Sequence, residues 1–263
     1  MIGFGELRKF SAQWQVEIPA VERVYVISWL LKGIFDHPLL AQSMALRGGA
    51  AIRYAYCAVF PLADDPEFIS TQSLSDEQVN NALAAALDSA ASASGLVFSL
   101  VSYERGGGKI EYTGPLGRRS AAQPRISISI SPRKTRLEPA RAPLLHPFSD
   151  ACAATLRAVA LDEMVGEQIA ALAGSPRTRE VYDLWFGLTQ MPDRVNAARA
   201  WDIAHKIAAE RNTALPHAGA MFSATHRAIL ERAWEKALRD ARGHPSFEQA
   251  ERDLQTAFEI FKR

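Results

Sequence analysis

The stretch that decides the fold runs from Met44 to Ser70 and reads MALRGGAAIRYAYCAVFPLADDPEFIS. It contains a glycine pair, Gly48 and Gly49, followed by an apolar, helix-like run over residues 50–60. Glycine lets the backbone approach a phosphate group closely, and the N-terminus of a helix attracts anions. The first half of the stretch therefore predicts a phosphate-facing turn that opens a helix.

The second half of the stretch carries the acidic group Asp64, Asp65 and Glu67, which follows a proline-marked turn. Two acids at positions i and i+2 of a strand point to the same face, so Asp65 and Glu67 can share a divalent metal ion. A glycine pair opening a helix, followed by two such carboxylates, is typical of a polymerase-type site for nucleotidyl transfer. We interpret the rest of the chain as support for this site, or for what remains of it.

Composition sets broad limits on partners and location. The chain has 263 residues, enough for one large domain or two modest ones, with 48% hydrophobic and 22% charged residues. A net charge of +1 means that any nucleic-acid binding must rest on a local patch. Cys57 and Cys152 lie in apolar stretches and are expected to be buried free thiols. No apolar run reaches the roughly 18 to 20 residues of a membrane span, so we expect a cytoplasmic protein.

The segments that flank the central stretch have clear periodicities. Residues 22–35 place apolar side chains at helical spacing, and residues 71–95 form a second expected helix, with Ser75 and Gln78 as a capping box. Residues 96–104 and 109–114 are expected to form a hairpin around three glycines. The segment RISISIS, residues 125–131, alternates strictly and predicts a strand with one buried face.

Basic residues gather next to this alternating strand. Between Arg118 and Arg141 there are seven lysines or arginines against one acid, Glu138. Two interpretations are open: a solvated loop, or a phosphate-facing patch beside the sheet.

Residues 132–150, rich in proline and histidine, predict an extended crossover and a domain boundary. Beyond it the apolar spacing is helical over 161–172, 177–188, 193–211, 223–242 and 246–261. We therefore predict an α+β protein, with a mixed sheet flanked by helices in residues 1–150 and an all-helical C-terminal domain in residues 151–263.

Four motifs, in order and at matching spacing, carry a family resemblance. They are the helix VERVYVISWLLKGIF at 21–35, RGGAAIRYAY at 47–56, ADDPEF at 63–68, and LDEMVGEQIAAL at 161–172 followed by RTREVYDLW at 177–185. With these segments the chain resembles the AbiEii/AbiGii family of nucleotidyltransferase toxins, which act in bacterial abortive-infection and toxin–antitoxin systems.

The resemblance implies a nucleotidyltransferase-type fold and a metal-dependent reaction that transfers a nucleotide from NTP to an RNA acceptor, in characterised members a tRNA. It implies that Asp65 and Glu67 are the catalytic residues and hold Mg²⁺ on the triphosphate. It also assigns nucleotide binding to Gly48, Gly49, Arg53 and Asp183, and implies a cognate antitoxin.

Two motif positions favour an alternative. The resemblance implies a third carboxylate on the strand at 125–131, but that position is Ser129. It also implies a lysine in the helical motif, but that position is Gln168. A hydroxyl cannot act as a base near pH 7, and a neutral amide cannot neutralise a phosphate. The alternative is therefore a catalytically degenerate nucleotidyltransferase fold that binds a nucleotide, an RNA or a protein.

Overall fold

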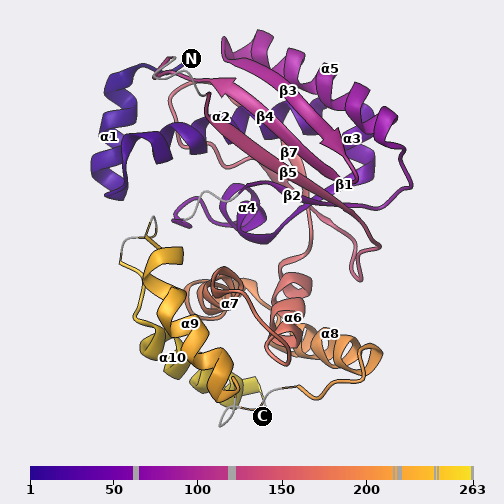
Figure 1. Ribbon diagram of the computed structural model, residues 1–263, viewed down its shortest axis with the longest axis vertical. Coiled ribbons are helices and arrows are strands. Elements are labelled where there is room, and N and C mark those ends of the chain that lie inside the picture. The colour runs from indigo at the N-terminus through magenta and orange to yellow at the C-terminus, as the bar shows by residue number, and fades with distance from the viewer. Residues whose placement is uncertain are drawn as a thin grey trace. The chain divides into compact units, whose positions relative to one another are not determined.

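The protein is described by a computed structural model that covers residues 1–61, 65–117, 123–215, 217, 221–239, 241 and 243–261. The chain forms two compact units, Met1–Val159 and Ala160–Arg263. The first unit holds the sheet and the helices that pack on it, and the second unit is helical (Figure 1). The predicted α+β fold class is confirmed.

The first unit contains five α-helices, one π-helix and seven strands within its described residues. In chain order they are α1 (Phe4–Trp14), α2 (Ile18–Asp36), α3 (Pro38–Ser43), β1 (Met44–Arg47), α4 (Gly48–Ala51), the π-helix Ile52–Tyr56, β2 (Glu67–Ser70), α5 (Asp76–Ser94), β3 (Val97–Glu104), β4 (Gly107–Thr113), β5 (Arg125–Pro132), β6 (Ala140–Pro143) and β7 (Thr155–Ala158).

The seven strands form one mixed sheet with the order β3-β4-β5-β2-β1-β7-β6. The short strand β2 lies at its centre, antiparallel to β1 and parallel to β5. Strand β7 runs parallel to β1, and β6 pairs with β7 at one edge. The sequence did not identify β1, β6 or β7, because each has only four residues and shows little alternation.

Helix α2 forms the centre of the core. Its sequence is apolar around most of the helix, as expected for a helix that is covered on most sides. Pro19 lies in its first turn, where proline is favoured. Residues Val21, Ile27, Leu31 and others on α2 are buried. In Figure 1 this helix runs behind the strands, and α5 packs against both α2 and β3. The predicted capping box of α5 is present, with Ser75 and Gln78 bonded reciprocally.

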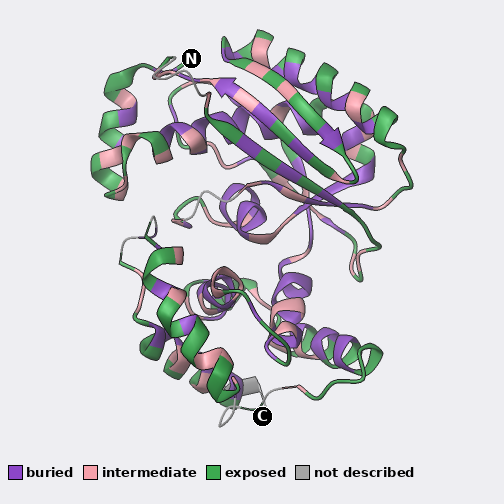
Figure 2. Ribbon diagram, in the orientation of Figure 1, coloured by how far each residue is buried: buried purple, intermediate pink, exposed green. Residues whose placement is uncertain are grey.

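Strand β5 has the predicted two-faced character. Its isoleucines Ile126, Ile128 and Ile130 are buried, whereas the serines between them are exposed. Figure 2 shows this alternation as bands along the strand. The face that carries Ser127, Ser129 and Ser131 is called the serine face below.

The second unit consists of five α-helices and a short 3₁₀ turn within its described residues. They are α6 (Leu161–Ala171), α7 (Thr178–Gln190), the 3₁₀ turn Pro192–Arg194, α8 (Ala197–Glu210), α9 (Ala224–Ala237) and α10 (Phe247–Phe261). A close approach of α6 and α8 depends on Gly166, where a Cβ would lie 2.6 Å from the Ala200 carbonyl oxygen. The five predicted helices of this half are all present; four are shorter than predicted, and α7 extends two residues further at its C-terminus.

Three expectations change in detail. The division between the units falls at Val159 instead of residue 150, because β7 joins the sheet of the first unit. The helical run predicted to extend to residue 60 ends at Tyr56, and its second half is a π-helix. Cys152 is a buried free thiol as expected, whereas Cys57 is free but only half-buried.

A buried polar network fastens the N-terminal segment to the first unit. The Tyr25 hydroxyl donates a hydrogen bond to Asp150 at 2.6 Å and accepts one from the Ile2 N–H at 3.3 Å. The His146 ring lies 2.9 Å from the other oxygen of Asp150, and its side chain is only 4% exposed. Burial lowers the pKa of His146, against the opposing influence of Asp150.

The helix contact at Gly33 predicts a large effect of one methyl group. A Cβ there would overlap the Ala86 carbonyl and lie 2.9 Å from the Ala90 Cβ, so Gly33→Ala should destabilise the protein by about 1–3 kcal/mol. Gly5→Ala, in α1 with nothing within 4 Å, should be neutral or stabilising by less than about 1 kcal/mol. Urea unfolding of both variants checks this, and equal effects would contradict the proposed close packing.

The His146 site predicts a pH dependence of stability. The unfolded chain binds a proton at His146 below about pH 6.5, whereas the folded protein resists protonation until lower pH, so the free energy of unfolding should fall as the pH drops below 6.5. His146→Gln should flatten this fall between about pH 7.5 and 5.5. The matched control is His205→Gln, at an exposed side chain, measured by urea unfolding at each pH.

Candidate functional site

The sheet register brings the central predicted residues together. Strand β2 pairs Glu67 with Arg47 of β1 on one side and with Ser129 of β5 on the other. Side chains of directly paired residues lie on the same face, so Glu67 belongs to the serine face with Ser129. The position at which the sequence suggests a missing third carboxylate is therefore the direct neighbour of Glu67.

Gly48 faces the same carboxylate from the end of β1. Its φ of +65° lies in the left-handed region that favours glycine, and a Cβ built there would be 3.7 Å from Glu67 Oε2. The chain turns at this residue from β1 directly into α4, which continues as the π-helix Ile52–Tyr56. Gly49 is buried within α4. The structure thus joins Gly48 and Glu67 in one place.

Asp65 lies just before β2 and is bound by other protein groups. Its Oδ1 atom accepts a hydrogen bond from the Ser127 N–H at 3.1 Å and is paired with the Arg23 guanidinium. The Ser129 N–H donates to the Pro66 carbonyl at 3.2 Å, so the Asp65 side chain adds a further bond to the β2–β5 ladder. The expectation of two acids within one strand is corrected, because β2 begins only after Pro66, which cannot donate to a ladder.

The described residues near Asp65 do not fit a Mg²⁺ site shared by Asp65 and Glu67. Proteins usually hold magnesium through one or two carboxylates together with substrate phosphates and water, whereas here a guanidinium already neutralises Asp65. The partner of Glu67 across the ladder is the neutral Ser129. Across the described part of the chain, no group of three His, Cys, Asp or Glu residues could hold a metal ion. Asp64, the remaining member of the acidic group, lies outside the described residues.

Arg53 is buried in the core of the first unit. It is 4% exposed, donates to the Phe60 carbonyl, and lies 4.8 Å from the centre of the Trp14 ring. Burial lowers its pKa from the usual arginine value. These contacts give Arg53 a structural role, which fixes the end of the π-helix, and its part in nucleotide binding stays a prediction.

Asp183 and Gln168 belong to the second unit. Asp183 is buried on α7, and Gln168 is half-buried on α6. Each residue is therefore placed within its own helix, and the predicted contribution of Asp183 to nucleotide binding remains a prediction.

Sequence reasoning missed two charged residues of α2, Glu22 and Arg23, which bind segments next to the site. Glu22 is buried and accepts a hydrogen bond from the Leu116 N–H at 2.7 Å, beside Gly114. Arg23 donates to the Arg125 carbonyl at 2.8 Å as well as to Asp65. The available signal was the charged pair itself, since two ionic residues in the largely apolar first half of a helix require partners.

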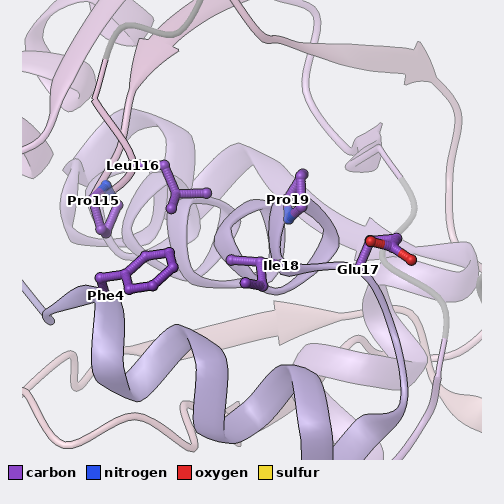
Figure 3. A pocket seen from close by; sticks show the side chains of 6 residues that line it. All are labelled: Phe4, Glu17, Ile18, Pro19, Pro115 and Leu116. Carbon is purple, nitrogen blue, oxygen red and sulfur yellow. The ribbon is translucent and has the colours of Figure 1, made fainter.

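A separate pocket of about 510 Å³ opens near the start of α1. Figure 3 shows the side chains around it, which are Phe4, Glu17, Ile18, Pro19, Pro115 and Leu116. Apart from Glu17 these side chains are apolar. None of the predicted catalytic or nucleotide-binding residues lines this pocket, so it is distinct from the Gly48–Glu67 site.

A comparison with known families identifies the family of this chain. Residues 29–259 match the family described as Nucleotidyl transferase AbiEii toxin, Type IV TA system. The chain belongs to this AbiEii family. The resemblance seen in the four sequence motifs is therefore confirmed. Membership of a type IV toxin–antitoxin family implies an NTP substrate and an antitoxin partner, and nucleotidyltransferases of this kind generally use divalent metals.

A solved structure shares the fold. MenT4, a nucleotidyltransferase toxin from Mycobacterium tuberculosis H37Rv, is similar with a TM-score of 0.56 and 12% sequence identity, over 97% of this chain and 98% of MenT4. At this identity the likeness shows the fold alone. Comparison with curated proteins gives no match. Within the described residues, no helix has the length and apolar character needed to cross a membrane.

The left-handed turn at Gly48 can be tested with a matched glycine. Gly48→Ala should lower the free energy of unfolding by about 1–2 kcal/mol, and so should Gly117→Ala, whose φ is +68°. Only the first variant places a methyl group beside Glu67, so only it should also weaken binding of a fluorescent ATP analogue. Equal loss of nucleotide binding in both variants would contradict a specific role of Gly48.

Proposed function

We propose that this AbiEii-family protein transfers a nucleotide from an NTP to an RNA acceptor, with tRNA the first acceptor to test. The observation that carries the proposal is the juxtaposition of the Gly48 backbone with the Glu67 carboxylate on the exposed serine face. A backbone turn without a side chain suits phosphate oxygens, and a carboxylate next to it suits the attacking hydroxyl.

The chemistry requires few groups. The RNA hydroxyl oxygen would attack the α-phosphorus of the NTP, form the new P–O bond and release diphosphate. In this arrangement the backbone N–H groups of Gly48 and Gly49 would bind phosphate oxygens, and Glu67 would accept the proton of the attacking hydroxyl. No step is assigned to Asp65, because Arg23 and Ser127 already bind it.

A second candidate function is binding without catalysis. Ser129 pairs directly with Glu67, so the ladder supplies a hydroxyl where a further carboxylate would strengthen the site. Loss of one charged group from a site of this kind typically costs a hundredfold or more in rate. A nucleotide- or RNA-binding module that retains the fold is therefore the alternative.

The proposal extends to the cellular setting. We propose a bacterial, cytoplasmic toxin that acts in an abortive-infection or other toxin–antitoxin system and is restrained by a cognate antitoxin. Support comes from the type IV toxin–antitoxin description of the matched family.

Label transfer to RNA tests the proposal. The protein would be incubated with Mg²⁺, each labelled NTP in turn and total tRNA. Wild type should label the RNA, and Glu67→Gln should reduce the rate by about a hundredfold or more because the amide cannot accept the proton. The matched control is Glu104→Gln, at an exposed position on β3, which is separated from Ser129 by strand β4 and from Glu67 by strands β4 and β5.

The outcomes separate the two candidates. Labelling that is lost in the Glu67 variant and kept in the Glu104 variant supports transfer. Absence of labelling with all four NTPs, from a folded protein that still binds a fluorescent NTP analogue, supports the binding module. Equal labelling by wild type and Glu67→Gln would contradict the role given to Glu67.

A further inference from the structure

We propose that Arg23 is a built-in counter-ion that takes the place of a divalent cation at Asp65, so that Asp65 acts as a positioning residue instead of a metal ligand. The proposal concerns the metal chemistry of this chain alone. It holds for a transferase and for a binding module alike, so it does not depend on the proposed function.

The geometry of the ion pair is the first support. The Arg23 guanidinium bridges two segments, donating through Nη1 to the Arg125 carbonyl at 2.8 Å and through Nη2 to Asp65. The same carboxylate oxygen accepts the Ser127 N–H at 3.1 Å. One end of β5 is thus linked to the segment before β2 through a single cation. A metal ion on this oxygen would have to compete with these two donors.

The anchoring of Arg23 is the second support. Its backbone belongs to α2, the buried central helix, and the Arg23 side chain is 26% exposed. The preceding Glu22 fixes the same turn of α2 to the Leu116 N–H. Glu22 therefore binds the described segment that follows β4, and Arg23 binds the first residue of β5. Because the backbone of Arg23 is fixed by α2 and its guanidinium is bonded to the Arg125 carbonyl, the guanidinium is pre-organised next to Asp65.

The charge balance is the third support. An arginine side chain stays protonated at all physiological pH values, so it neutralises Asp65 permanently. A dication bound to Asp65 would lie within a few ångströms of this fixed positive charge and be repelled. Arg125, whose carbonyl Arg23 binds, is paired through its own side chain with Glu111 at 2.7 Å, so its charge is balanced separately. Arg23 is the cation paired with Asp65.

Mn²⁺ binding tests the proposal without NTP or RNA. Mn²⁺ serves as a spectroscopic substitute for Mg²⁺, and free Mn²⁺ is measured by electron paramagnetic resonance during titration of wild type, Asp65→Asn, Arg23→Gln and the double variant. Asp65→Asn should change the Mn²⁺ affinity of wild type less than about twofold. Arg23→Gln should raise the affinity about tenfold by removing the repelling charge, and adding Asp65→Asn should reverse that gain.

Two results would overturn the proposal. One is a loss of Mn²⁺ affinity of about tenfold or more in Asp65→Asn alone, which would make Asp65 a metal ligand in the native protein. The other is an unchanged affinity in Arg23→Gln. If Arg23→Gln does not fold, Arg23→Lys retains the charge and should keep the wild-type Mn²⁺ affinity, and the comparison of wild type with Asp65→Asn still decides.

Discussion

The short strand β2 is the constraint on which the rest of the first unit depends. It has only four residues, yet it pairs with β1 on one side and β5 on the other, in opposite directions. That double pairing fixes which residues face one another, so Glu67 meets Arg47 and Ser129, and Gly48 lies next to the Glu67 carboxylate. A shift of one residue in either pairing would turn Glu67 to the buried face. The candidate site is therefore a consequence of strand register more than of any single side chain.

Helix α2 supports this strand register through its packing and its charged residues. Its apolar residues form the core of the first unit, and Arg23 near its N-terminus reaches β5, while Glu22 binds the Leu116 N–H in the segment after β4. Arg23 binds both Asp65 and the first residue of β5, which stabilises the β2–β5 pairing at the end where the site lies. The same interaction occupies one oxygen of the Asp65 carboxylate. Stability of the sheet and electrostatics of the site are thus connected through one guanidinium group.

Family and fold constrain function without deciding it. The chain belongs to the AbiEii family, and its fold is similar to that of MenT4 at 12% identity. A fold can be kept while its site changes, so the function has to be argued from the residues present. Here the backbone turn at Gly48 and the carboxylate of Glu67 remain, while Ser129 supplies a hydroxyl at the neighbouring position. This combination is the reason that transfer and binding are tested side by side.

The sequence by itself determined the elements with strong periodicity. The apolar helix over 22–35, the capping box at Ser75 and the alternation of residues 125–131 each follow from local spacing, and the structure confirms them. The family resemblance also marked Ser129 as the position of the expected third carboxylate. Only the tertiary structure decided the strand pairing at β2, the capture of Asp65 by Arg23 and the burial of Arg53. Arg23 and Asp65 are 42 residues apart, and no local pattern encodes which distant charges become partners when strands and helices pack.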